Sequence, residues 1–151
     1  MLETLPVFVI SGLLESGKTT FINKNFPNSI KLNIFDYQED CFLLQHYIDA
    51  QEKAKSDLLQ IALLNDVVME HTLLKKKRRL EQIEFLRNGG YDGEIHLIFL
   101  NPPMDILEKR TLQRHKTQSS LNFLKNHSDI VELPTKEEGF TSVSILENEY
   151  E

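Results

Sequence analysis

Short apolar runs alternate along this chain with longer amphipathic stretches. The runs hold several branched residues and little internal polarity, which is typical of strands buried on both faces of a sheet. The pattern predicts five strands: Pro6 to Ser11, Ser29 to Phe35, Asp66 to Glu70, Glu94 to Leu100 and Ser142 to Leu146.

Helical spacing of apolar residues fills the stretches between these runs. The predicted helices are Lys18 to Lys24, Glu39 to Leu63, Leu74 to Asn88, Met104 to Lys116 and Gln118 to Lys125. Residues 126–140 are predicted to be irregular. Strands that alternate with helices indicate an α/β fold with one parallel sheet covered on both faces. No repeat or linker divides the chain, so we expect a single domain over residues 1–151.

Composition and charge narrow the class of protein. The chain has 151 residues, a net charge of -6 and one cysteine. An acidic chain does not favour a nucleic-acid coat, although a local basic groove stays open. A lone cysteine excludes a Cys-rich metal site. No stretch approaches the roughly 20 apolar residues that span a bilayer, so we expect a cytoplasmic protein without a membrane partner.

A phosphate-binding motif follows the first predicted strand. Residues 12–19 read Gly-Leu-Leu-Glu-Ser-Gly-Lys-Thr and match G-x-x-x-x-G-K-[ST] at every fixed position. Glycines let the backbone turn its N–H groups inward, and the next helix adds its positive end. Lys18 can reach the β- and γ-phosphates, and Thr19 can offer its hydroxyl to Mg²⁺. The residues expected to bind nucleotide are Gly12, Leu13, Leu14, Glu15, Ser16, Gly17, Lys18, Thr19 and Thr20.

The motif predicts a nucleotide and leaves the reaction open. The loop resembles that of the CobW-type GTPases, so a GTP hydrolase of that kind is one alternative. The chain holds neither a D-x-x-G motif nor a well-placed N-K-x-D motif, and it lacks the Cys-rich metal motif of that group.

Arginines later in the chain favour phosphoryl transfer. Arg110 and Arg114 are spaced i, i+4 on one face of a predicted helix, where two guanidinium groups can cover a triphosphate. The run Lys75 to Arg79 is the densest basic segment. It is expected to be a solvated helix end, with one of its two arginines able to face the site.

The order of these features resembles the polynucleotide-kinase and zeta-toxin-like group of P-loop kinases. Besides the phosphate loop, the resemblance rests on Asp36-Tyr37, on Glu70-His-Thr-Leu73 with Arg78-Arg79, and on the arginine pair. It ends with Pro134-Thr-Lys-Glu-Glu-Gly-Phe140 before the last strand. The string around Asp36 departs from the group, which often has two acids and an arginine there.

The resemblance implies a three-layer P-loop NTPase fold with a five-stranded parallel sheet in the order 2-3-1-4-5. It also implies ATP-dependent phosphorylation of a hydroxyl. Asp36 would be the general base, and Glu70 would lie near Mg²⁺ together with Thr19. Lys18, Arg110 and Arg114 would stabilise the transferred group.

The sequence therefore predicts an ATP- and Mg²⁺-dependent kinase. Its partners would be a nucleoside triphosphate and an unknown hydroxyl-bearing acceptor: a small molecule, a nucleoside or a nucleic-acid end. The alternatives are the GTP hydrolase and a nucleotide-binding protein without catalytic activity, because the acceptor side around Asp36 is imperfect.

Overall fold

A computed structural model describes residues 4–147, so both ends of the predicted domain, residues 1–3 and 148–151, lie outside the described part. Five parallel strands form one sheet in the order β2-β3-β1-β4-β5, as predicted. Their bounds are β1 Val7–Gly12, β2 Ile30–Asn33, β3 Val67–Glu70, β4 Ile95–Leu100 and β5 Ser142–Leu146. In this register Val7 pairs with Val67 on one side and with Ile95 on the other.

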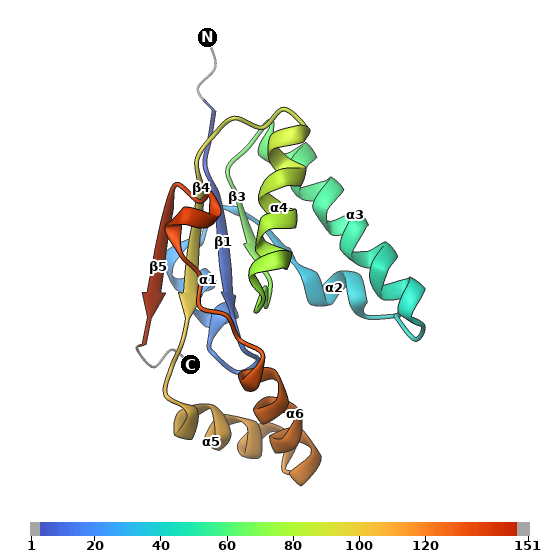
Figure 1. The fold of residues 1–151 in the computed structure, drawn as a ribbon, viewed down its shortest axis with the longest axis vertical. Coiled ribbons are helices and arrows are strands. Elements are labelled where there is room, and N and C mark those ends of the chain that lie inside the picture. The colour runs from blue at the N-terminus through green and yellow to red at the C-terminus, as the bar shows by residue number, and fades with distance from the viewer. Residues whose placement is uncertain (1–3, 148–151) are drawn as a thin grey trace.

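Helices cover both faces of the sheet, and two more stand beyond its carboxyl edge (Figure 1). α3 and α4 lie on one face and α1 on the other, while α5 and α6 lie past the ends of the strands. The bounds are α1 Lys18–Asn25, α2 Ile34–Gln38, α3 Leu44–Ala62, α4 Lys76–Asn88, α5 Met104–His115 and α6 Gln118–Asp129. A 3₁₀ turn, η1, spans Lys136–Glu138.

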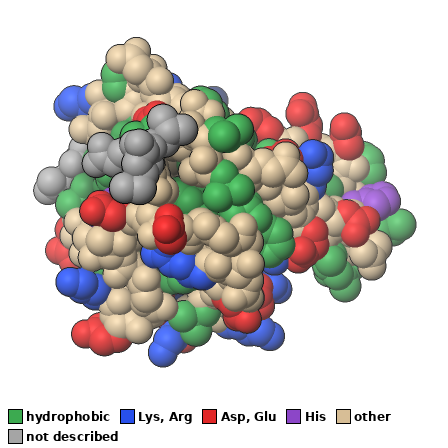
Figure 2. Space-filling model, turned by 90° about the horizontal axis from the view of Figure 1, so that it is seen from above, with side chains coloured by type: hydrophobic (Ala, Val, Ile, Leu, Met, Phe, Trp, Pro, Cys, Tyr) green, Lys and Arg blue, Asp and Glu red, His purple; other side chains and the backbone are tan. Residues whose placement is uncertain are grey.

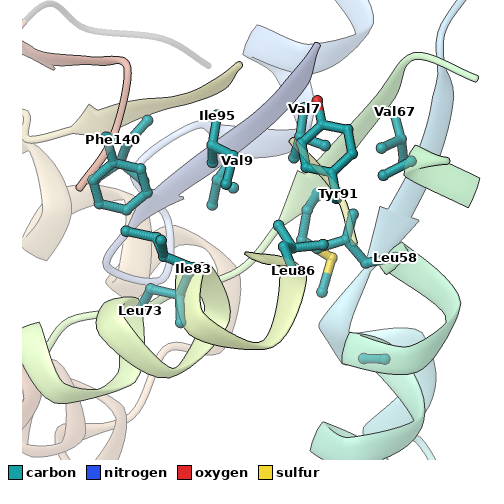
Figure 3. Close-up of a cluster of buried hydrophobic side chains, with 14 of the residues drawn as sticks. Val7, Val9, Leu58, Val67, Leu73, Ile83, Leu86, Tyr91, Ile95 and Phe140 are labelled. Carbon is teal, nitrogen blue, oxygen red and sulfur yellow. The ribbon is translucent and has the colours of Figure 1, made fainter. Parts of the chain in front are cut away.

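The larger core lies between the sheet and the pair α3 and α4. Side chains such as Val9 and Ile95 from the strands meet Leu58 of α3 and Leu86 of α4 (Figure 3). On the other face, Phe21 and Ile22 of α1 pack on the sheet, as the helical spacing predicts. Burial of this apolar surface holds the carboxyl ends of the strands in fixed positions.

The second strand is shorter than predicted, and this moves Asp36 into a helix. β2 ends at Asn33, and the short helix α2 follows at once. The side chain of Asn33 accepts a hydrogen bond of 2.9 Å from the backbone N–H of Phe35. An asparagine in this position satisfies a free N–H at a helix start, which explains why the strand stops there.

Two other boundaries were wrong. α3 begins at Leu44 rather than at Glu39. The segment predicted as irregular holds the last turn of α6 and the 3₁₀ turn η1. The side chains of Thr135 and Glu138 form a capping box around η1, a local pairing that does not depend on apolar periodicity.

The start of α3 projects from the body of the molecule. Figure 2, seen from above, shows hydrophobic side chains gathered at the end of this projection. Phe42, Leu43 and Leu44 are more than half exposed there. No helix within residues 4–147 is both long enough and apolar enough to cross a bilayer.

Candidate functional site

The phosphate loop connects the central strand β1 to α1. Gly12 has a φ of 144°, and a Cβ atom there would lie 2.6 Å from the carbonyl oxygen of Leu100 and 2.8 Å from Oγ of Ser16. Gly17, with a φ of 95°, ends the loop one residue before α1. Glycine is needed at both positions, because the backbone is left-handed at each and the first is closely packed. The loop therefore delivers the N-terminus of α1 to the carboxyl edge of the sheet.

Lys18 is folded against this loop. Its Nζ donates hydrogen bonds of 3.0 Å to the carbonyl oxygen of Gly12 and 2.8 Å to that of Leu13. Burial lowers the pKa of the Lys18 ammonium to about 8, while the carboxylates of Glu70 and Glu15 act in the opposite direction. An anion bound at the loop would raise the pKa of this lysine again.

Thr19 and Glu70 meet at the end of β3. The Thr19 hydroxyl lies 2.8 and 2.9 Å from the two carboxylate oxygens of Glu70. Asn33 donates to the same carboxylate at 3.1 Å. A hydroxyl and a carboxylate side by side are oxygen ligands of the kind that Mg²⁺ prefers, so this pair fits the ion. The described residues contain no cluster of three or more His, Cys, Asp or Glu side chains that could hold another metal.

Both predicted arginines of α5 reach the phosphate loop through Glu15. Nη1 of Arg110 donates a hydrogen bond of 3.0 Å to the backbone oxygen of Glu15. Nε and Nη2 of Arg110 are buried and have no hydrogen-bond partner in the described part of the chain. Nε of Arg114 and Nε2 of His115 each lie 3.5 Å from a carboxylate oxygen of Glu15. The structure thus brings together the loop and the arginine pair that lie almost a hundred residues apart.

Glu15 itself has a left-handed backbone, with a φ of 67°. Residues with a side chain rarely adopt this conformation, which costs about 1–2 kcal/mol. From the sequence, Glu15 is predicted only as a member of the nucleotide-binding loop. Its contacts with α5 have no sequence signal, because they depend on how the helix crosses the loop.

Two cavities meet at the loop. The first, here called the phosphate cavity, has a volume of about 580 Å³ and is lined among others by Lys18, Thr19, Glu70, Arg110 and Arg114. The second, the apolar cavity, has about 610 Å³ and lies towards α6. Both are lined by Leu14, Glu15 and Phe35, so one opens next to the other.

Asp36, the predicted general base, lines neither cavity. It is exposed on α2, next to Phe35. The structure brings Lys18, Thr19, Glu70, Arg110 and Arg114 into one cavity and leaves Asp36 outside it. Its role as a base stays a prediction.

The two arginines of the basic run have structural partners. Arg79 is fully buried and pairs with both carboxylate oxygens of Glu138, at 2.6 and 3.0 Å. It also donates to the backbone oxygen of Leu73 at 2.9 Å. Arg78 is exposed and pairs with Glu81 at 3.1 Å. Neither arginine lines the phosphate cavity, so the prediction that one of them faces the site is wrong for this cavity. Arg79 instead connects α4 to η1 through its ion pair with Glu138.

His71 follows Glu70 and is also buried. Its Nε2 lies 2.9 Å from the amide oxygen of Gln51, and none of the described residues pairs with its Nδ1. Burial, with smaller contributions from the charges of Lys18 and Arg78, lowers the pKa of His71 to about 3. The imidazole is therefore neutral at physiological pH.

The fold is shared with solved kinase structures. A protein from Chloroflexus aurantiacus that is described as a kinase aligns over 96% of this chain and 89% of its own length, with a TM-score of 0.73 and 14% identity. A gluconokinase from Sinorhizobium meliloti 1021 aligns with 97% of this chain and 84% of its own, at a TM-score of 0.67 and 16% identity. Chaetomium thermophilum Kti12, solved with ADP-AlF3, aligns with 94% of this chain and 89% of its own, at a TM-score of 0.64 and 14% identity. No protein-family model and no curated protein matches the chain. At these identities the likeness establishes that the chain has the fold of P-loop kinases.

Proposed function

We propose that this chain binds ATP with Mg²⁺ and transfers the γ-phosphoryl group to a hydroxyl of a separate acceptor. The observation that carries the proposal is Arg110, whose Nε and Nη2 are buried beside the phosphate loop without a partner among residues 4–147. A buried guanidinium is costly unless an anion pairs with it. A triphosphate in the phosphate cavity supplies that anion.

Each charged group of the phosphate cavity has a role in this reaction. Lys18 binds the β- and γ-phosphates, and its lowered pKa rises when they bind. Thr19 and Glu70 would hold Mg²⁺, which offsets negative charge on the phosphate oxygens. Arg110 and Arg114 offset the charge that develops on the transferred group.

The acceptor hydroxyl approaches from the boundary of the two cavities. Its oxygen attacks the γ-phosphorus, the bond from that phosphorus to the β–γ bridging oxygen breaks, and ADP leaves with this oxygen. The hydroxyl proton passes to a carboxylate. The resemblance to P-loop kinases implies this role for Asp36, while Glu15 is the carboxylate that borders both cavities. The variants Asp36→Asn and Glu15→Gln distinguish these two candidate bases. The variant that loses phosphoryl transfer but still binds ATP identifies the base.

The first experiment follows label from γ-labelled ATP and Mg²⁺ into a panel of nucleosides, oligonucleotides, sugars and small alcohols. We expect label on one acceptor class. Lys18→Ala abolishes ATP binding, and Lys24→Ala serves as the matched control because Lys24 is exposed on the same helix. Normal ATP binding by Lys18→Ala would contradict the proposal.

A nucleotide-binding protein without catalytic activity is the second candidate. The exposed position of Asp36, outside both cavities, favours it. Tight ATP binding without label on any acceptor or in free phosphate identifies this case. No finding favours a GTP hydrolase of the CobW kind, and a titration with ATP and GTP tests that alternative through a clear preference for GTP.

A further inference from the structure

The apolar cavity has a lining that restricts what it can bind. Its floor consists of Leu13, Leu74 and Leu124, which belong to one buried cluster. Among residues 4–147 no lysine, arginine or aspartate lines it, Glu15 is its only carboxylate, and His115 and His127 are its basic side chains. A negatively charged ligand would therefore meet a negative charge and no lysine or arginine to pair with, which is unfavourable.

Two phenylalanine rings border this cavity from separate elements. Phe35 comes from α2 and Phe123 from α6, which stand apart at the carboxyl end of the sheet (Figure 1). Phe123 is 49% exposed although it lines a cavity. Its ring centroid lies 3.9 Å from that of His127, whose Nδ1 lies 2.9 Å from the backbone oxygen of Phe123. The two rings pack on each other with an interplanar angle of 30°, and this pair of rings is here called the platform.

Polar side chains also line this cavity, and some of them, such as His115 and Ser120, already have partners. The side chains of Gln38 and Thr72 line it without a hydrogen-bond partner among residues 4–147. An amide presents a donor and an acceptor together, which matches the edge of a heterocyclic base. A carboxylate at the boundary, such as Glu15, is suited to accept hydrogen bonds from ribose hydroxyls.

We propose that the apolar cavity is the acceptor site and that it binds an uncharged nucleoside, with the base stacked on the platform of Phe123 and His127. The ribose then lies at the boundary with the phosphate cavity, beside Glu15 and Phe35. A volume of about 610 Å³ lies within the usual size of small-molecule sites. This inference rests on the proposed kinase function for its biological meaning, but the binding site can be tested without it.

Equilibrium dialysis tests the site directly. The four labelled ribonucleosides are dialysed against the full chain with saturating Mg²⁺ and a non-hydrolysable ATP analogue, which keeps the phosphate cavity occupied. Competitors are the 3′- and 5′-monophosphates, gluconate and glucose. We expect at least one nucleoside to bind ten times more tightly than its monophosphates and the sugars. Tighter binding of a monophosphate, gluconate or glucose would overturn the inference.

Variants of Phe123 test the stacking. Phe123→Ala should weaken nucleoside binding about 5- to 100-fold, as loss of one base–aromatic stack does, while Phe123→Tyr should retain it. Phe42→Ala is the matched control, because Phe42 is exposed on the projection of α3 and lines neither cavity. Equal nucleoside affinities of Phe123→Ala and the wild-type chain refute the platform.

Transfer assays with the same panel separate the two proposals. Nucleoside binding without phosphoryl transfer supports the site and contradicts the kinase. Transfer to gluconate, glucose or a nucleotide, with nucleosides inert, supports the kinase and overturns the nucleoside site.

Discussion

Replacing the buried Arg79 by methionine should destabilise the protein far more than the same change at its neighbour Arg78. The Arg79 and Glu138 side chains are 0% and 2% exposed, and three hydrogen bonds converge on the guanidinium. Arg79→Met removes one partner and leaves the Glu138 carboxylate buried. Breaking a buried pair in this way costs about 3–5 kcal/mol of unfolding free energy. For a chain of this size the melting temperature should fall by roughly 6–20 °C.

Urea unfolding followed by circular dichroism measures this loss. Arg78→Met is the control, because its pair with Glu81 is exposed and is expected to contribute no more than about 1 kcal/mol. The double variant Arg79→Met/Glu138→Met should recover most of the stability, since no charge is then left unpaired. Its remaining deficit comes from two lost hydrogen bonds, from the backbone N–H of Thr135 to Glu138 and from Arg79 to the backbone oxygen of Leu73, together about 1–2 kcal/mol.

Equal losses for Arg79→Met and Arg78→Met would refute this reasoning. ATP affinity provides an independent check, because neither arginine lines the phosphate cavity. Folded Arg79→Met protein should bind ATP as the wild type does. A specific loss of ATP binding would mean that Arg79 contacts the nucleotide.

Three further predictions concern charges at the site. Titration calorimetry should show ATP affinity falling by up to tenfold per pH unit above pH 8. Lys18 has a pKa of about 8, so above this pH it must take up a proton before it can bind phosphate. A constant ATP affinity up to pH 9.5 would contradict this. Between pH 7 and 5 the unfolding free energy of the wild-type chain should fall by about 2 kcal/mol more than that of His71→Gln. The reason is that the pKa of the His71 imidazole is near 6.5 in the unfolded chain and about 3 in the folded one, so only the unfolded chain takes up this proton. Urea midpoints that change with pH in parallel for the two proteins would contradict this. Glu15→Gln should tighten ATP binding about fivefold at low salt, because the change removes a negative charge beside the triphosphate and frees Arg114 from its ion pair. Weaker ATP binding by this variant would show that Glu15 instead positions Arg114.

The sequence predicted the sheet because its signals are local. Unbroken apolar runs mark buried parallel strands, and the phosphate loop marks the turn from β1 to α1. The strand order came from the resemblance. The arginine pair was found because both residues lie on one helical face.

Other features depend on tertiary contacts and escaped prediction. The helix start at Asn33 rests on a single side-chain hydrogen bond, so Asp36 was placed at a strand end rather than in α2. Arg79 and Glu138 lie 59 residues apart, and neither segment contains a local sequence pattern that predicts their ion pair. The apolar cavity forms where α2, α6 and the loop meet, which no periodicity encodes.

The central position of β1 has a consequence for synthesis of the chain. β1 leaves the ribosome before both strands that pair with it, β3 and β4. Val7 can pair only after Val67 and then Ile95 have been synthesised. Until then the apolar run of residues 7–12 has unpaired strand edges, and long-range parallel pairing of this kind forms slowly. Slower translation of the first hundred residues would prolong this exposure, so chaperone demand and soluble yield in expression should depend on how quickly β3 and β4 follow.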